Sequence, residues 1–262
     1  MMSPYAVEGP AMISFSGGRT SAYMLRQVVD LGLDADVHVL FANTGKEREE
    51  TLDFIHEIEA RWKVNVRWLE YGRGEVCYET ASRRGEPFEA LLKKRGFPPH
   101  PLARFCTSEL KIRTRKKFML EEGYEHWTNV VGIRWDEPRR VARLLSPNKE
   151  RWDVELPLHH AKVTEQGVMD WWAAQPFDLQ LRQDEGNCDL CFLKGRRKRL
   201  HLIRERPQSA DWWIAQEAAL GPFRVDTANY ASMKEEVRCS PMLFPELDGP
   251  DMTDLGDCVC HD

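Results

Sequence analysis

The sequence has no run of about 18 apolar residues, which is the length that a membrane-spanning helix needs. Its first residues, 1–10, have neither a basic start nor an apolar centre, so we expect no signal peptide. Internal repeats and low-complexity tracts are absent as well. The net charge of −5 argues against a protein that binds nucleic acid through its overall charge. We therefore expect a globular protein of the cytoplasm without membrane association.

The glycine turn near the start, AMISFSGGRTS, follows neither G-x-x-x-x-G-K-[ST] nor G-x-G-x-x-G. Residues 11–13 are apolar, as at the end of a buried strand, and residues 22–31 have apolar side chains at helical spacing. Gly17 and Gly18 allow close approach of the backbone to a ligand, and the first amides of a helix favour an anion. The turn thus predicts a phosphate or sulfate site. The alternative is a strand–turn–helix junction that binds no ligand and needs glycine only for its backbone geometry.

Apolar runs at 37–42, 64–69 and 127–133 predict further strands, and a helix is expected from about Glu49 to Trp62. This order predicts an α/β fold, a Rossmann-like doubly wound, mostly parallel sheet. Asn43 and Thr44 follow the second strand, at the edge where such sheets bind ligands. An Asx turn without ligand contact explains Asn43 equally well.

The chain between residues 71 and 105 is expected to be irregular around one short helix at 88–94. A helix capped by Thr107 or Ser108 should then run to about Glu122. Five of the seven residues 111–117 are basic, and beside an anion site such a cluster would neutralise the ligand. After the strand at 127–133, Asp136 and Glu137 are candidates for binding Mg²⁺ or for pairing with Arg139 and Arg140.

The cysteine count, seven, is odd, and without an export signal it indicates metal or redox chemistry rather than disulfides. Cys188 and Cys191 form a C-x-x-C pair, and Cys106 at a helix start is well placed for a thiolate. These three thiols, with a fourth from elsewhere, would suit an iron–sulfur cluster or zinc equally. Incidental cysteines in a disordered C-terminal tail are the alternative for Cys258 and Cys260.

The second part of the chain is expected to be helical. Thr164 should cap a helix that runs to Gln175, and Ser209 another one. The segment 194–206 has seven Lys or Arg residues and predicts a basic helix, either a nucleic-acid footprint or the counter-charge of an anionic cluster. From Gly221 onward we expect irregular structure. The organisation predicted is a nucleotide-binding α/β domain, 1–160, followed by a helical, metal-cluster-bearing region, 161–262.

The string SFSGGRTS resembles the PP-loop of the adenine nucleotide alpha-hydrolase-like superfamily, in particular its PAPS reductase family. The segments ANTGKEREET and GIRWDEPRR and the later C-x-x-C are similar to further motifs of that family. The resemblance implies that the loop holds the pyrophosphate of ATP or the phosphosulfate of a sulfonucleotide, with Mg²⁺. The residues implied in nucleotide binding are Ser14, Ser16, Gly17, Gly18, Arg19, Thr20, Ser21, Asn43, Thr44, Gly132 and Arg134.

The resemblance also assigns roles around the reaction. Arg134 and Lys111 would stabilise developing negative charge. Family reductases with a [4Fe–4S] cluster have a Cys-Cys pair before the basic helix, whereas Cys106 stands alone here. The C-terminal DCVCH keeps the C-x-x-H spacing of the reductase ending, which would make Cys258 the nucleophile. The cluster ligands expected are Cys106, Cys188, Cys191 and, as the fourth, Cys260.

Three functions follow as hypotheses. The first is an ATP pyrophosphatase that adenylates an acceptor for sulfur insertion, as in DNA phosphorothioation or tRNA thiolation. The second is an APS or PAPS reductase in which Cys258 attacks sulfur. The third is a non-catalytic nucleotide-sensing or DNA-binding subunit. The partners expected are an adenine nucleotide, DNA or tRNA, and a cysteine desulfurase or another sulfur donor, in a homodimer.

Overall fold

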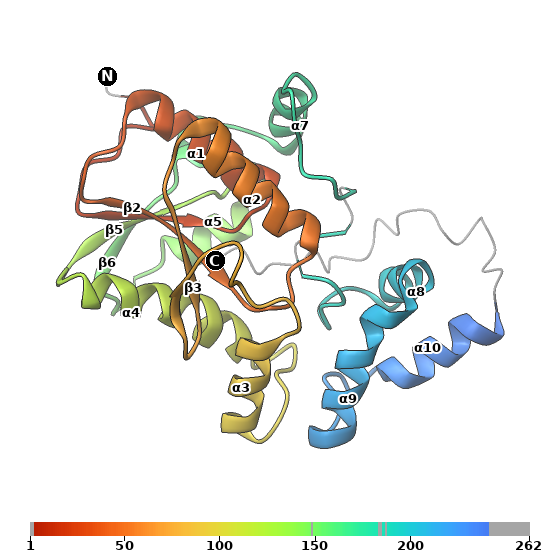
Figure 1. Ribbon diagram of the computed structural model, residues 1–262. Coiled ribbons are helices and arrows are strands. Elements are labelled where there is room, and N and C mark those ends of the chain that lie inside the picture. Colours follow the sequence, from red (N-terminus) through yellow and green to blue (C-terminus); the bar gives the residue numbers. More distant parts are fainter. Residues whose placement is uncertain (1–2, 148, 183–184, 187, 241–262) are drawn as a thin grey trace.

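The computed structural model describes residues 3–147, 149–182, 185–186 and 188–240. Its centre is a six-stranded sheet in the order β4-β3-β2-β1-β5-β6 (Figure 1). All neighbouring strands are parallel except β3 and β4. The strands are β1 (Ala11–Phe15), β2 (Val37–Asn43), β3 (Val66–Glu70), β4 (Gly74–Val76), β5 (Trp127–Val131) and β6 (Trp152–Glu155). This arrangement confirms the predicted doubly wound α/β sheet.

Helices cover both faces of the sheet because its strands are apolar on both sides, as parallel strands usually are. On β1, Ile13 and Phe15 join the core beneath α1 (Arg19–Leu31) and α2 (Glu49–Trp62), whereas Met12 points to the other face. There Met12 meets Phe118 and Met119 of α4 (Thr114–Glu121). The alternation follows from the two-residue period of a strand.

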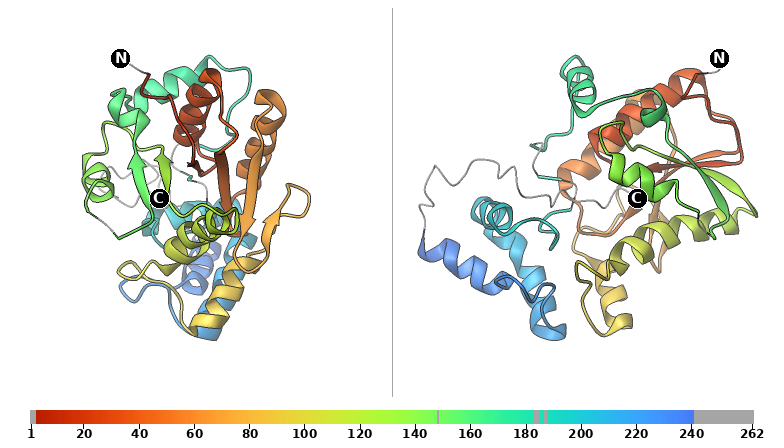
Figure 2. Two further views of the ribbon diagram at one scale, coloured as in Figure 1. Left: turned by 90° about the vertical axis from the view of Figure 1, so that its left-hand side faces the viewer. Right: turned by 180° about the vertical axis from the view of Figure 1, so that it is seen from behind.

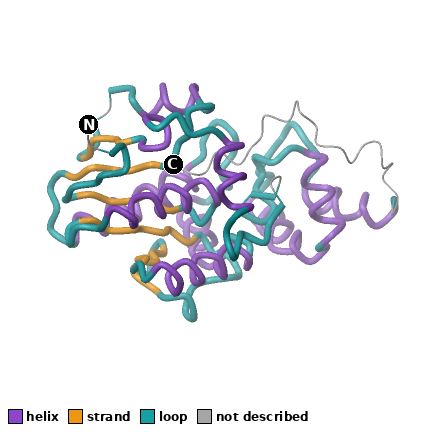
Figure 3. The backbone as a smooth tube through the Cα atoms, turned by 90° about the horizontal axis from the view of Figure 1, so that it is seen from above, coloured by secondary structure: helices purple, strands orange, loops and turns teal. Residues whose placement is uncertain are grey.

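The remaining helices lie around this sandwich. They are α3 (Glu86–Arg95), the π-helix η1 (Cys106–Arg113), α5 (Pro138–Leu144), α6 (Pro157–His160), α7 (Glu165–Ala173), α8 (Arg196–Glu205), the 3₁₀ turn η2 (Pro207–Ser209), α9 (Ala210–Leu220) and α10 (Tyr230–Cys239). Figure 2 shows α8, α9 and α10 gathered beside one end of the sheet, and Figure 3 shows the sheet and these helices from above.

These three helices have a core of their own. Leu200, Trp213 and Tyr230 pack with Phe88 of α3 and with Cys106 and its neighbours on η1. In contrast, Val168 and Trp172 of α7 belong to the core of the sheet, and so do Leu179 and Leu181. The core of the α/β part therefore extends about 20 residues beyond the boundary expected at residue 160.

Several local expectations were wrong. The region after Gly221 contains α10, whose N-cap is Asn229; the side chain of Asn229 accepts from the amide of Ser232 at 2.8 Å. That cap and the spacing of Tyr230, Met233 and Val237 were readable signals of a helix. The strand β4 and the helix α5 were also missed, because both are too short for their periodicity to show.

Two predicted caps are not caps. The helix that starts near Thr107 begins at Cys106 as a π-helix, and the hydroxyl of Ser108 donates back to the carbonyl of Phe105 at 3.4 Å. Ser209 precedes α9, but its hydroxyl donates to the carbonyl of Arg206 at 2.7 Å. Thr164 does cap α7, accepting from the amide of Gly167. None of the described helices has the length and apolar character needed to cross a bilayer.

Candidate functional site

The glycine turn lies at the carboxyl end of β1 and leads directly into α1. Gly17 has a φ of +75°, and Gly18 is the N-cap residue of the helix. The hydroxyl of Ser21 donates to the carbonyl of Gly18 at 3.0 Å and accepts from the amide of Ser16 at 3.3 Å. These contacts close the loop on itself. The first amides of α1 have no acceptor within the helix, so the loop has the geometry of an anion site.

Replacing Gly17 by alanine should damage this loop more than its backbone angle alone accounts for. An added Cβ would lie 2.7 Å from side-chain carbons of Thr51 and Ile55 on α2. Gly72 has nearly the same φ, +76°, with nothing within 4 Å of its added Cβ. We expect Gly72→Ala to cost about 1 kcal/mol and Gly17→Ala clearly more, with loss of nucleotide binding. Thermal unfolding and titration with an ATP analogue measure both, and equal destabilisation would contradict the packing argument.

Arg134 reaches the loop from β5, the neighbouring strand. Its Nη1 lies 3.3 Å from Oγ1 of Thr20, and its side chain is only 17 % exposed. Carboxylates of Asp136 and Glu165 hold the rest of the guanidinium, at 2.9 and 3.3 Å. Gly132 packs beside them, and a Cβ there would lie 3.2 Å from Cα of Ser21. The end of β5 is thus fitted closely to the start of α1.

Asp136 and Glu137 do pair with arginines. Of the two expected partners, Arg139 and Arg140, only Arg140 forms such a pair within the described residues, and Asp136 pairs with Arg134. Glu137 contacts Arg140 as well as Arg134. Burial raises the pKa of Asp136, but the amide of Glu165 and the guanidinium of Arg134 outweigh it, and the pKa lies below its ordinary value. Asp136 therefore supports the position of Arg134 as an anion.

The pairing of Asp136 predicts a pH-dependent stability effect. Because its pKa is lowered on folding, its contribution is present above the unfolded pKa of about 3.9 and is lost as the pH falls through the folded value. We expect Asp136→Asn to lower the midpoint of thermal unfolding at pH 7. The difference from the wild type should close below about pH 4. A difference that stays constant between neutral and acidic pH would contradict the pairing.

The turn after β2 is held by its own side chains. The amide group of Asn43 donates to Glu70 and to the carbonyl of Ser82, and its oxygen accepts from the amide of Gly45 at 2.9 Å. Asn43 is fully buried and forms the Asx turn that the sequence left as one of two readings. Glu47 accepts from the amide and the hydroxyl of Thr44, each at 2.8 Å.

Three predicted cysteines line one small cavity beside this turn. Cys106 comes from the first turn of η1, and Cys188 and Cys191 from the segment before α8. The cavity measures about 20 Å³, and its lining consists of Thr44, Lys46, Phe88, Cys106, Thr107, Leu110, Lys111, Cys188, Cys191, Phe192 and Trp213. The i, i+4 and i, i+5 spacing of Cys106, Leu110 and Lys111 places them together because η1 is a π-helix. Nζ of Lys111 lies 3.6 Å from Glu47.

The cysteine segment is fastened to the turn after β2. Glu47 and Cys188 form a β-bridge, and the amide of Asp189 donates to the carbonyl of Lys46 at 2.9 Å. Nζ of Lys46 pairs with Asp189 at 2.7 Å, and the indole of Trp213 donates to the same carboxylate at 3.0 Å. All of these groups are largely buried. The cysteine cavity is therefore a fixed part of the sheet's ligand edge.

Three thiols and two lysines line this cavity, and the lysines, Lys46 and Lys111, also pair with Asp189 and Glu47. No group of three or more His, Cys, Asp or Glu side chains among the described residues is arranged to hold a metal ion. None of the five described cysteines is in a disulfide. The proposed nucleophile Cys258 and fourth ligand Cys260 lie outside the described residues.

Some predicted binding residues have structural partners instead. Arg19 forms a bidentate pair with Asp178 at 2.7–3.0 Å and donates to the carbonyl of Leu181. Ser14 lies within β1 and its hydroxyl donates to Asn129 on β5 at 2.7 Å. Both residues fix the surroundings of the loop. Lys111 lies at the cysteine cavity, on the β2 side of the loop, whereas Arg134 lies on the β5 side.

The basic helix after the cysteines is partly internal. Lys194 and Arg199 are buried, and Arg199 donates to the hydroxyl of Thr227 at 3.0 Å and lies over the ring of Tyr230. Lys194 donates to the carbonyl of Glu185, and Arg196 pairs with Glu236. Much of this charge holds α8 against α10, so the run of Lys and Arg is not by itself a nucleic-acid surface.

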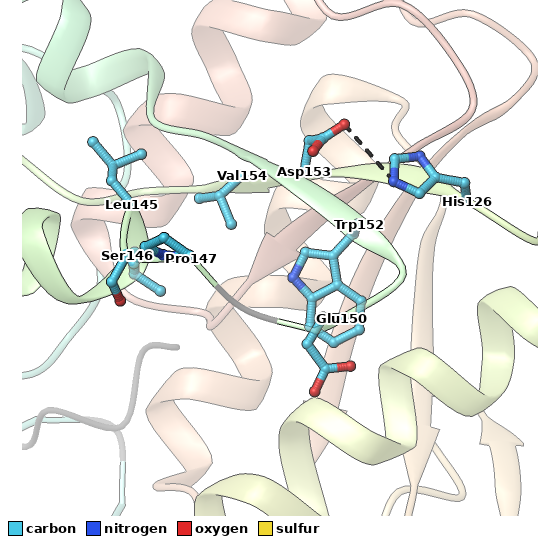
Figure 4. A pocket seen from close by; sticks show the side chains of 9 residues that line it. His126, Leu145, Ser146, Pro147, Glu150, Trp152, Asp153 and Val154 are labelled. Atoms are coloured by element: carbon cyan, nitrogen blue, oxygen red, sulfur yellow. Dashed lines mark ion pairs between the residues drawn. The ribbon is translucent and has the colours of Figure 1, made fainter.

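A second cavity, of about 310 Å³, lies near the amino ends of β5 and β6 (Figure 4). His126, Glu150, Trp152 and Asp153 are among its lining residues, and His126 pairs with Asp153 at 3.8 Å. No predicted site residue lines it. Its position at the amino ends sets it apart from the glycine loop and the cysteines, which lie at the carboxyl ends.

Sequence reasoning missed Lys46, Glu47 and Asp189, which join the turn after β2 to the cysteine segment. One signal was available: Lys46 and Glu47 follow a buried strand directly, in the part of the sheet where ligands bind. It also missed Glu70, which is buried at the end of β3 and accepts from Asn43 and from the amide and hydroxyl of Ser82. Glu70 also pairs with Arg73, three residues along the chain, at 2.7 Å, but its partners Ser82 and Asn43 lie 12 and 27 residues away.

Comparisons with known proteins relate the chain to one family. Residues 10–161 match the model of the phosphoadenosine phosphosulfate reductase domain. The nin region protein ORF290 of Escherichia phage lambda is 32% identical over 204 residues, which are 71% of this chain and 67% of the phage protein. A Methanocaldococcus jannaschii protein is 33% identical over 129 residues, 49% of this chain, but the match spans only 23% of that protein.

Among solved structures, the PAPS reductase of Candida auris in its phosphate complex matches with a TM-score of 0.44 and 16% identity, over 68% of this chain and 82% of that chain. Because the family model covers more than half of the sequence, the resemblance read from SFSGGRTS is confirmed, and the protein belongs to the phosphoadenosine phosphosulfate reductase domain family.

Proposed function

We propose that this protein is an ATP pyrophosphatase that adenylates an acceptor on a nucleic acid as the first step of sulfur insertion. The proposal deepens what the family implies, a nucleotide-binding enzyme of sulfur chemistry. The observation that carries it is the placement of two different groups at one sheet edge. The glycine loop and Arg134 form an anion site, and the cysteine cavity lies beside the next strand.

In the proposed reaction an acceptor oxygen attacks the α-phosphorus of ATP. The bond between the α-phosphorus and the bridging oxygen breaks, and pyrophosphate leaves with Mg²⁺. The amides of the loop and the hydroxyls of Ser16 and Thr20 hold the pyrophosphate, and Nη1 of Arg134 stabilises charge that develops on it. Hydrosulfide then displaces AMP from the activated acceptor atom, a base carbon or a backbone phosphorus, so that one oxygen is replaced by one sulfur without net oxidation or reduction.

Cys106, Cys188 and Cys191 would hold an iron–sulfur cluster beside this reaction. Because a [4Fe–4S] cluster is usually held by four thiolates, three protein thiolates leave the fourth iron to be bound by Cys260 or by another ligand. When bound, the cluster would supply a binding place for the sulfur nucleophile. Lys46 and Lys111 line the same cavity, and their charge would favour an anionic cluster and its sulfide there.

The test is incubation of the anaerobically purified protein with Mg²⁺, sulfide and ATP labelled at the α-phosphate, with and without tRNA or DNA, while pyrophosphate is measured by a separate coupled assay. With the nucleic acid and sulfide present, we expect labelled AMP and pyrophosphate in equal amounts. Release of sulfite from APS or PAPS, abolished by Cys258→Ser, would instead identify a reductase of the kind for which the family is named. Nucleotide binding without either product would indicate a non-catalytic subunit. Both results would overturn the proposal.

A further inference from the structure

The protein contains nine tryptophans, all within the described residues, and only Trp135 is exposed. It is 47% exposed, whereas the other eight are buried or half-buried. Burying a tryptophan is strongly favourable, so an exposed one is informative when it stands at a ligand edge. Trp135 follows Arg134, the residue that reaches the glycine loop.

The ring of Trp135 is held in place rather than loose. It stacks on the imidazole of His159, with ring centres 4.9 Å apart and planes inclined by 24°. The amide of Trp135 donates to the carbonyl of Val163 at 2.9 Å. His159 belongs to α6, which follows β6, so two adjacent strand ends support the ring. A flat aromatic surface fixed in this way suits stacking with another ring.

One cation contacts this ring, and a second follows it in the sequence. Nζ of Lys162 lies 5.7 Å from the ring centre, near the outer limit of a cation–π contact. Lys162 has a φ of +55°, an unusual angle for a lysine, within a turn closed by hydrogen bonds from its own amide to His159 and from Val163 to Leu158. Arg139, four residues after Trp135, is exposed as well. An exposed lysine can swing off the ring and still meet a phosphate.

We infer that Trp135 is a stacking platform for a base of single-stranded nucleic acid, with Lys162 and Arg139 contacting its backbone phosphates. This inference rests on the proposed function for its substrate class. The loop amides already serve the phosphates of the nucleotide, so cations farther along the edge fit a second, polyanionic ligand. Aromatic stacking flanked by cations is how proteins bind single strands without reading their sequence.

The test measures the binding of a fluorescein-labelled single-stranded RNA and DNA by anisotropy, with the full chain. We expect Trp135→Ala to weaken binding about 10- to 100-fold and Trp135→Phe to keep much of it. Arg139→Ala and Lys162→Gln should each reduce the slope of log binding constant against log salt concentration by about one released counterion. Phe97→Ala is the matched control, because Phe97 is equally exposed, at 47%, on the loop after α3.

A parallel titration with a non-hydrolysable ATP analogue separates the possible outcomes. We expect the analogue to bind Trp135→Ala as it binds the wild type. Unchanged strand binding by Trp135→Ala would overturn the inference, and so would weaker analogue binding with unchanged strand binding, which would assign the ring to adenine. Because neither assay measures pyrophosphate, a failure of the proposed reaction remains distinguishable from a failure of this inference.

Discussion

Arg134→Ala is expected to slow the release of pyrophosphate from ATP by about 10²- to 10³-fold, the usual cost of removing one group that stabilises developing charge. The guanidinium is largely buried and its Nη1 lies 3.3 Å from Thr20 in the glycine loop. Asp136, Glu137 and Glu165 fix its orientation. The effect should fall mainly on kcat, because the loop amides remain to bind the nucleotide. Arg134→Lys should be intermediate, since lysine keeps the charge and loses the planar fork.

The measurement is the initial rate at saturating ATP, with analogue binding measured in parallel. Arg26→Ala is a suitable control, because Arg26 is also an ion-paired arginine, bonded to Asp30 within α1. The Arg26→Ala variant should release pyrophosphate from ATP at the wild-type rate. If Arg134→Ala retains the wild-type rate, Arg134 has only a structural role at the end of β5. If it loses analogue binding and rate together, its contribution is to binding the nucleotide rather than to the reaction.

The elements predicted from the sequence are those whose periodicity is long enough to see. The helix from Glu49 to Trp62 has the predicted bounds, and the strands β1, β2, β3 and β5 stand where apolar runs indicated them. The sheet places β1 between β2 and β5, all parallel, so the strand order reverses at β1. The elements β4 and α5 are too short to show such a periodicity. The π-helix at Cys106 could not be read at all, because nothing in CTSELKIR separates a π-helix from an α-helix.

The proximity of the candidate residues was predictable where they follow strand ends, because topology alone brings those ends together. The glycine loop and Arg134 are examples. Polar side chains that form hydrogen bonds or ion pairs with distant parts of the same chain were less predictable. Arg19 is paired with a residue 159 positions away, and Asn43 with one 27 positions away. The internal part of the Lys and Arg run in α8 was not predictable for the same reason, because Arg199 bonds Thr227, 28 residues later.

Loss of iron from each of three single variants is the second expected result. If Cys106, Cys188 and Cys191 hold one cluster, the anaerobically purified protein should contain about four iron and four sulfide per chain. Cys106→Ala, Cys188→Ala and Cys191→Ala should each lose most of both. The three thiols line the same cavity, although they come from η1 and from a segment about 80 residues later. Cys260→Ala tests the fourth ligand in the same way.

Cys77→Ala is the control, because Cys77 is exposed and its Sγ lies 3.3 Å from Oγ1 of Thr80, outside the cavity lining. It should keep its iron. One zinc per chain, lost in the same three variants, would keep the thiolate site but replace the cluster by a single ion. Iron and zinc both absent from the wild type, or metal content that none of the three substitutions lowers, would contradict a metal centre. The buried pair of Lys46 and Asp189 would then serve only to join α8 and its neighbours to the sheet.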